Sequence, residues 1–315
     1  MDVCSIFSRH PSWLPSFLKD SPKDLDHLRD YDVGTVQKLL QESRLFDLWD
    51  HFLRGQARLM FSNHDKEWFS QKKWWNSANN VLEIGSGNGS YLSLISEAFP
   101  NKKLEGVDFN SKYVDQATAE YAHQGISFRL GNAEEELPAH QGRFDVVFFR
   151  FTLQWLKHPE RALELAHRYL KPGGILLIID SYDPAAHSSR VIDSLENSVR
   201  QLHERTRETA KGNRRISMEI LTKLQEGTSP LSRLYRVHHT SLDGNGNRLE
   251  RGLCFESQDE LERYLNQNLL FFGILEKQYG ISVDLPTARR EIQSYIDEKG
   301  FQTAPGVHYL VLEKI

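Results

Sequence analysis

The sequence has few of the residues on which disulfide and metal sites depend. Only two of its 315 residues are cysteines, and Cys4 and Cys254 lie far apart. That spacing excludes a disulfide framework and a cysteine metal site, and a reduced, cytoplasmic setting fits it. The adjacent His238 and His239 have no acidic partners at ligand spacing, so we expect no metal ion.

Long apolar runs and a surplus of basic charge are also missing. No uninterrupted apolar run reaches the roughly 18 residues of a membrane helix, and residues 1–20 do not combine a charged leader with an apolar segment. We therefore expect neither a signal peptide nor a membrane span. The formal net charge is -4, whereas nucleic-acid binders usually carry clustered lysine and arginine, so we expect no nucleic-acid partner.

The middle of the chain alternates between short apolar runs and amphipathic helices. The runs cover residues 81–84, 104–107, 126–130, 145–149 and 175–179. Repeats of strand, helix and strand predict a parallel sheet with helices on both faces. Residues 171–174, Lys-Pro-Gly-Gly, end the helix before the fifth run.

Helical patterns flank this alternation. Residues 33–62 have apolar residues at spacings of three and four, which predicts one helix. Two more strands are predicted after Asp180, at residues 234–242 and 307–312. An alternative pairs residues 234–242 with residues 248–255 as a hairpin. Periodicity does not separate these two interpretations.

The strongest local signal is a glycine-rich turn between the first strand and the helix after it. Gly85, Gly87 and Gly89 permit a sharp turn and a close backbone approach to a ligand, beside free N–H groups at a helix N-terminus. Asp108 closes the second strand, where a carboxylate can accept hydrogen bonds from ribose hydroxyls. The glycine spacing differs from the dinucleotide fingerprint, which disfavours a nicotinamide cofactor. A tight turn with a helix cap is the simpler alternative.

Six segments in order resemble the motif series of class I, Rossmann-like S-adenosylmethionine-dependent methyltransferases. They are residues 81–89, 106–108, 131–134, 144–147, 153–156 and 170–174. The resemblance covers about residues 80–180. It implies S-adenosyl-L-methionine as the cofactor and S-adenosyl-L-homocysteine as its product.

The resemblance also implies an α/β fold with a seven-stranded, mostly parallel, doubly wound sheet whose last strand is antiparallel. Residues 1–78 are expected to form a helical N-terminal cap, and residues 79–182 the cofactor-binding core. Residues 183–315 would complete the core, with helical insertions at about 187–230 and 257–299 that form a cap or lid.

Carried over by position, the resemblance places the methionine end of the cofactor at the glycine turn, the ribose at Asp108 and the adenine after the third strand. Twelve residues are candidates: Glu83, Gly85, Ser86, Gly87, Asn88, Gly89, Asp108, Phe109, Asn132, Ala133, Arg150 and Phe151. Asn132 stands where many relatives have aspartate, although its amide can still pair with adenine. Arg150 stands where asparagine or serine is common. It could bind a carboxylate of the cofactor or acceptor, or form a structural ion pair.

The run Leu153-Gln154-Trp155 resembles that of methyltransferases acting on small molecules, many of them acids or natural-product intermediates. Methyl transfer from a sulfonium depends on positioning and on water exclusion, and needs no catalytic residue. If a base is needed, the candidates are His187, His238, His239 and His308. The candidate acceptor-binding residues are Trp13, Trp49, Gln154, Trp155 and Tyr182. The alternatives are a protein or peptide methyltransferase and a non-catalytic cofactor-binding module.

Overall fold

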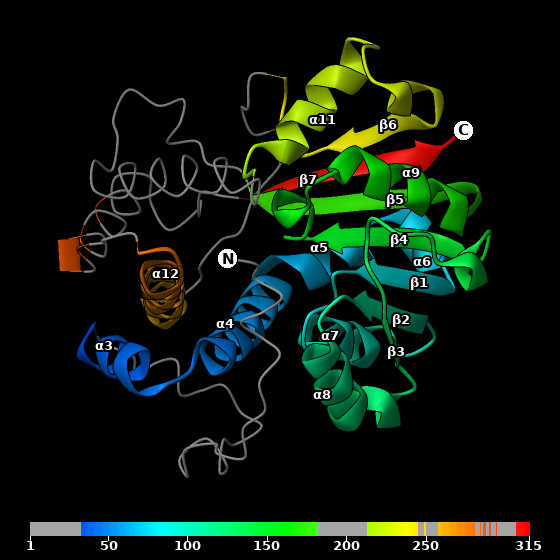
Figure 1. Cartoon of the computed structure of the whole chain (residues 1–315). Helices are drawn as coiled ribbons and strands as arrows, with labels where there is room; N and C mark the ends of the chain where they lie inside the picture. Colours follow the sequence, from blue (N-terminus) through cyan, green and yellow to red (C-terminus); the bar gives the residue numbers. More distant parts are fainter. Residues whose placement is uncertain are drawn as a thin grey trace.

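The computed structural model describes residues 33–181, 213–244, 249, 258–280, 284, 286, 287, 290, 294 and 307–315. They contain a seven-stranded sheet with the strand order β3-β2-β1-β4-β5-β7-β6 (Figure 1). The strands are β1 (Asn80–Ile84), β2 (Lys103–Asp108), β3 (Ser127–Leu130), β4 (Phe144–Arg150), β5 (Leu170–Ser181), β6 (Tyr235–Thr240) and β7 (Val307–Lys314).

Strands β1 to β5 are mutually parallel, and β7 runs antiparallel to both of its neighbours, β5 and β6. The expected fold class, including the antiparallel last strand, is confirmed. Because β6 pairs with β7, the sixth-strand interpretation holds. Leu249 is the one described residue of the alternative hairpin partner, and its N–H donates to the carbonyl of Ser241 at 2.9 Å.

Strand β5 begins five residues earlier than the sequence predicted. Leu170 already pairs with Phe144, and the register then shifts before Val146 pairs with Ile175. Gly173 lies in this irregular stretch with a φ of 69°. The glycines predicted as a turn therefore form a bulge within the strand rather than a separate connection.

Helices cover both faces of the sheet because alternate strand residues point to opposite sides. Leu82 and Ile84 face one side, where they pack with α9 (Pro159–Tyr169) and α11 (Ile216–Gln225). Val81 faces the other side, with α7 (Ser90–Ala98), α5 (Lys66–Ser70) and α6 (Lys73–Ser77). Helix α8 (Ser111–Tyr121) contacts β2 and β3.

Helix α11 lies in the first of the two expected insertions. Residues 187–230 were expected to form part of a cap or lid, and α11 packs against β5, β6 and β7. Its Ile220 and Leu221 are buried in the main core, and the helix also contacts η5 (Leu153–Trp155), the turn after β4. Residues 187–212 of the same segment lie outside the described residues.

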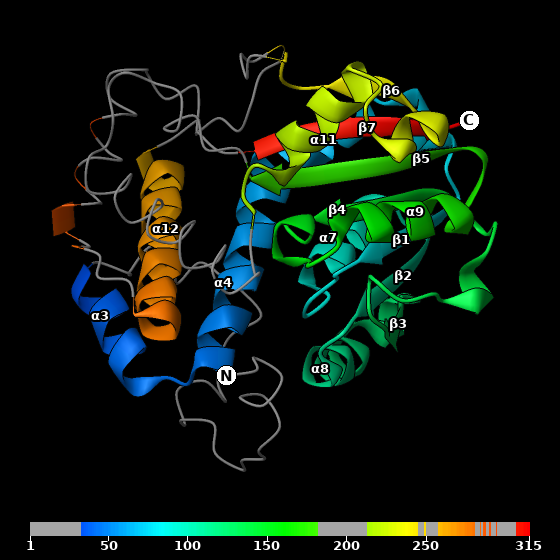
Figure 2. The same cartoon turned by 45° about the horizontal axis from the view of Figure 1, so that its top comes forward.

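Three helices form a separate layer beside the sheet, which we call the helical cap: α3 (Val33–Glu42), α4 (Leu45–Met60) and α12 (Gln258–Tyr279) (Figures 1 and 2). Leu48 and Phe52 of α4 pack against Leu270 and Ile274 of α12. Gly273 lets α3 approach, since a Cβ there would lie 2.0 Å from Leu40 Cδ1.

The single helix expected over residues 33–62 is interrupted at residues 43 and 44. Arg44 adopts extended backbone angles, with φ -77° and ψ 157°. Lys277 of α12 donates to the carbonyls of Leu40 and Ser43, at 2.5 and 2.7 Å, and so supplies partners where α3 ends. The amphipathic pattern was correct, but the partner that ends α3 lies more than 200 residues away along the chain.

A π-helical turn, η2 (Phe61–Asp65), joins α4 to α5 and places a carboxylate inside the protein. Asp65 has no solvent exposure. It accepts hydrogen bonds from the hydroxyls of Tyr91 on α7, at 2.7 Å, and Tyr309 on β7. Its Oδ1 also lies 3.0 Å from His64 Nδ1. One side chain thus connects the N-terminal helices to two parts of the core.

None of the helices in the described part of the chain is long and apolar enough to cross a membrane.

Candidate cofactor and acceptor site

The glycine turn follows β1 and requires glycine at its first position. Gly85 has a φ of 79°, and a Cβ there would lie 2.2 Å from Thr152 Oγ1. Gly87 and Gly89 also have positive φ, at 53° and 77°. A Cβ on Gly87 would meet only Leu53 Cδ1 of the cap, at 3.2 Å. Gly85 is therefore packed against the core, whereas Gly87 faces the helical cap.

Asp108 ends β2 beside this turn. Its Oδ2 accepts from the N–H of Gly87 at 2.8 Å, and its Oδ1 from the N–H of Asn110 at 2.9 Å. Burial raises the pKa of Asp108 above its usual value, although these backbone N–H groups act to lower it. The structure thus brings Asp108 and Gly87 together as the sequence predicted.

Two large apolar side chains beside Asp108 are exposed. Phe109 is 62% exposed and Leu130 is 60% exposed, and Leu130 lies opposite Asp108 in the β2–β3 register. A carboxylate flanked by exposed apolar groups suits a nucleoside, whose ribose offers hydroxyls and whose base offers two flat faces. Phe109 was a predicted cofactor residue. Leu130 was not singled out, because its exposure depends on where β3 ends.

Asn132 and Ala133 follow β3. The Asn132 carbonyl oxygen accepts from the N–H of Glu134 at 3.0 Å, and its amide donates to Glu135 at 3.0 Å. The side chain therefore closes its own turn, and Ala133 packs against the core. The pairing of Asn132 with adenine stays a prediction.

Asn88, another predicted cofactor residue, connects the glycine turn to the cap. Its amide donates to Asp50 Oδ1 on α4 at 2.7 Å, and its own oxygen accepts from the Ser90 hydroxyl at 2.8 Å. Ser86 and Ser90 are both largely buried in the same turn. The Asn88 side chain thus holds the cap against the turn.

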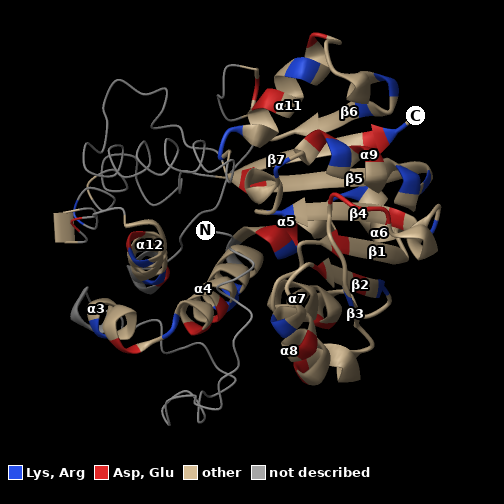
Figure 3. Ribbon diagram, viewed as in Figure 1, with Lys and Arg blue, Asp and Glu red and all other residues tan. Residues whose placement is uncertain are grey.

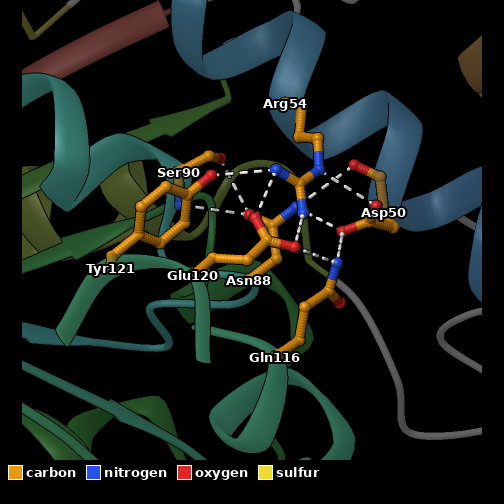
Figure 4. A network of polar contacts seen from close by, with 7 residues as sticks. All are labelled: Asp50, Arg54, Asn88, Ser90, Gln116, Glu120 and Tyr121. Atoms are coloured by element: carbon orange, nitrogen blue, oxygen red, sulfur yellow. Dashed lines mark hydrogen bonds and ion pairs between the residues drawn. The ribbon is translucent and has the colours of Figure 1, made fainter. Parts of the chain in front are cut away.

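This contact belongs to a polar network that fastens α4 to the core (Figure 4). Arg54 donates to Asp50 at 3.0 Å, to Glu120 at 2.8 Å and to the Tyr121 hydroxyl at 2.8 Å. Gln116 of α8 donates to Asp50 at 3.0 Å. The network could not be predicted from the sequence, because spacing within each helix does not reveal pairing between helices.

On the acceptor side, aromatic residues gather between the cap and the loop after β4. Trp49 lies edge-on to Trp155, with ring centroids 6.3 Å apart, and to Phe271 of α12 at 6.2 Å. The structure therefore brings together two predicted acceptor residues, Trp49 and Trp155. Trp13 and Tyr182 lie outside the described residues.

Gln154 is buried in the loop after β4, between Phe151 and β5. Its amide donates to the carbonyl of Phe151 at 3.2 Å, and its oxygen accepts from the Ser181 hydroxyl at 3.3 Å. Phe151 has a φ of 52°, a conformation that costs a bulky residue free energy and is concentrated at functional sites. Burial raises the pKa of Asp180, which accepts from the N–H groups of Ser181 and Gln154, to about 7.

Three of the four histidines predicted as bases lie among the described residues, and these three are not gathered in one place. His238 lies on edge strand β6, with Nδ1 3.6 Å from Glu313, and His239 faces Trp68. His308 is fully buried opposite Asp180 in the β5–β7 ladder, with Nε2 2.9 Å from Thr240 Oγ1. His187 lies outside the described residues. Of the other three, His308 lies nearest the carboxyl end of β5.

The glycine turn, the buried acid after β2 and the strand order coincide with a known family. Residues 82–178 match the family model described as a methyltransferase domain. Residues 82–178 thus form a methyltransferase domain. Its fold is of the class I, Rossmann-like kind, in which S-adenosylmethionine is the cofactor.

Curated relatives of this methyltransferase domain differ in how much of the chain they match. The ubiquinone/menaquinone biosynthesis C-methyltransferase of Desulfotalea psychrophila is 30% identical over 108 residues, which cover 34% of this chain and 44% of that protein. The malonyl-[acyl-carrier protein] O-methyltransferase 2 of Ilyobacter polytropus is 26% identical over 225 residues, 64% of this chain and 83% of that protein. The chain thus spans less than half of the first relative and most of the second.

Proposed function

We propose that this protein binds S-adenosylmethionine at the carboxyl ends of β1, β2 and β4 and transfers its methyl group to a small organic acceptor. The observation that supports this most directly is the convergence of Gly85, Gly87 and Asp108 beside the exposed ring of Phe109. Parallel α/β sheets bind ligands at the carboxyl ends of strands where the strand order reverses, as it does here between β1 and β4.

The acceptor would lie between the loop after β4 and the helical cap. The aromatic rings of Trp49, Trp155 and Phe271 form an apolar wall there, which suits the exclusion of water from a sulfonium. One relative is named as a C-methyltransferase of ubiquinone/menaquinone biosynthesis, and the other as an O-methyltransferase of malonyl-[acyl-carrier protein]. The acceptors that we propose therefore include carboxylate-bearing molecules and natural products. A cap fastened to the glycine turn favours a small acceptor over the open groove of a peptide methyltransferase.

Methyl transfer itself is an in-line displacement in which the acceptor atom bonds to the methyl carbon as the sulfur leaves with its electron pair. The chain's contribution would be to align the two centres and exclude water. If the acceptor must lose a proton, His308 is the predicted histidine best placed to take it, through its position beside β5. Asp180, whose pKa is raised, lies opposite His308 in the β5–β7 ladder.

We further propose a cytoplasmic setting without a nucleic-acid partner. The two distant cysteines support the first part. Interspersed charges support the second, because Figure 3 shows both signs along the described elements, as on α9 with Glu160 in its first turn and Arg168 in its last.

Incubation with methyl-labelled S-adenosylmethionine and a cell extract tests the reaction. We expect label to move from S-adenosylmethionine into a second small molecule, separated from it by chromatography, and to do so only when the protein is present. Label in precipitated protein would instead identify a protein methyltransferase. Binding of the cofactor without any transfer across extracts would support the non-catalytic alternative.

Replacing Asp108 with alanine is expected to weaken binding of S-adenosylhomocysteine by about 1–3 kcal/mol, because the ribose hydroxyls lose a charged acceptor. Binding by the wild type should also weaken at acidic pH. Because its pKa is raised, Asp108 takes up a proton at a higher pH than an ordinary aspartate does. The protonated side chain can no longer accept hydrogen bonds from both ribose hydroxyls as a carboxylate. Calorimetric titration measures both effects. Asp115→Ala, at an exposed position on α8, is the matched control, and equal affinities for the two variants would refute the assignment.

A further inference from the structure

A buried glutamate and a buried arginine at the glycine turn each have a polar atom without a hydrogen-bond partner among the described residues. The side chains of Glu83 on β1 and Arg150 on β4 are 1% and 6% exposed. Arg150 Nε lies 3.8 Å from Glu83 Oε1, which is too long for a hydrogen bond. Within the described part of the chain, neither Glu83 Oε2 nor Arg150 Nε has a hydrogen-bond partner.

Arg150 is nevertheless held in a defined orientation. Its Nη1 donates to Gln56 Oε1 of the cap helix α4 at 3.1 Å. Its guanidinium lies over the ring of Tyr91, 4.3 Å from the centroid, and the Tyr91 hydroxyl is fixed by Asp65. Three separate elements therefore position this guanidinium, while its Nε has no acceptor among the residues that the structure describes. Such an arrangement is costly in a buried site unless a further group completes it.

We propose that Arg150 binds the carboxylate at the amino-acid end of the cofactor, that Glu83 binds its ammonium group, and that Gln56 on the cap orients Arg150. The proposal rests on the cofactor site proposed above. An α-amino acid carries one group of each charge on a single carbon, which matches an acceptor and a donor separated by a few ångströms. The cap would then take part in cofactor recognition as well as in enclosing the acceptor.

The protonation of Glu83 supports this arrangement. Burial is the main cause that raises the pKa of Glu83 to about 8; Arg150 on β4 acts to lower this pKa and Asp108 on β2 acts to raise it. In the unliganded protein at neutral pH, Glu83 therefore holds a proton. An ammonium group favours the ionised carboxylate, so binding should release that proton, and affinity should increase as pH rises from about 6 to 7.5, below the usual pKa of an α-amino group.

A comparison of two ligands tests the role of Arg150. The ligands are S-adenosylhomocysteine and its analogue without the carboxylate, each titrated calorimetrically. We expect the wild type to prefer the carboxylate-bearing ligand by about tenfold or more, as a charged hydrogen-bonded pair would provide. Arg150→Gln should abolish most of this preference while leaving affinity for the analogue nearly unchanged. Gln56→Ala should reduce the preference by a smaller factor.

Arg236→Gln is the matched control, because Arg236 is an exposed arginine on β6 that donates to Glu313. It should keep the preference. If Arg150→Gln keeps it too, Arg150 has only a structural role and the proposal fails. Equal wild-type affinities for the two ligands would also overturn it, while the proposed function would stand. No binding of either ligand would overturn both.

Proton release tests the role of Glu83 independently. Titration of the wild type with S-adenosylhomocysteine at neutral pH, in two buffers of different ionisation enthalpy, should show protons passing to the buffer. Glu83→Gln keeps the shape of the side chain but cannot ionise, so its binding heat should not depend on the buffer. Wild-type binding without proton release would remove Glu83 from the proposal.

Discussion

Replacing Gly85 with alanine is expected to destabilise the protein by about 2–5 kcal/mol and to abolish cofactor binding. The new Cβ would lie 2.2 Å from Thr152 Oγ1 and 2.4 Å from Thr152 Cγ2, so the loop after β4 would have to move. Left-handed backbone costs a non-glycine residue about 1–2 kcal/mol, and overpacking adds about 1–3 kcal/mol. Denaturant unfolding measures the first effect and calorimetric titration the second.

Gly125→Ala separates strain from collision. Gly125 has a φ of 80°, nearly that of Gly85, but a Cβ there meets nothing within 4 Å. In Gly125→Ala, the free energy of unfolding should therefore fall only by the cost of left-handed backbone for alanine, about 1–2 kcal/mol. The variant should bind cofactor normally. If the two variants are equally stable, contact with Thr152 is not what requires glycine at position 85.

Removing the Asp65 carboxylate should cost about 2–4 kcal/mol of unfolding free energy in Asp65→Ala. Tyr91 and Tyr309 would keep buried hydroxyls without their charged acceptor, and each such loss costs about 1–3 kcal/mol. Thermal and denaturant unfolding measure the change.

Two further variants establish the cause of this loss. Asp115→Ala removes an exposed acid from α8 and should change stability by less than about 0.5 kcal/mol. Adding Tyr91→Phe and Tyr309→Phe to Asp65→Ala removes the two hydroxyls that donated to Asp65 and should recover much of the stability. If the triple variant is less stable than Asp65→Ala, the lost acceptor for these hydroxyls does not explain the loss.

The sheet could be predicted because the apolar sequence of a strand indicates that the strand is buried. Residues 175–179 are apolar on both faces because helices cover both sides of β5, and the same holds for β1 and β4. The break at residues 43 and 44 was not predictable, because Lys277 supplies the partners that end α3. The local sequence pattern indicates which residues are buried, but it does not indicate which distant residues contact them.

The same distinction applies to the site. The positions of Gly85, Gly87 and Asp108 followed from their places after β1 and β2. The surroundings of Arg150 did not, because Gln56 comes from α4 and Tyr91 from α7. Asn88 was assigned to the cofactor on the basis of its turn alone, whereas its side-chain partners include Asp50, 38 positions earlier.

The helical cap is built from segments far apart in the chain, and this separation has a consequence for protein synthesis. Gln267 of α12 donates to the carbonyl of Phe52 on α4 across 215 positions. On the ribosome, the apolar stripe of α4 emerges first and must wait for α12, while β1 to β5 pair entirely within residues 80–181. The nascent chain can therefore complete the central strands before α12 is made, and during that interval the apolar stripe of α4 is open to chaperones.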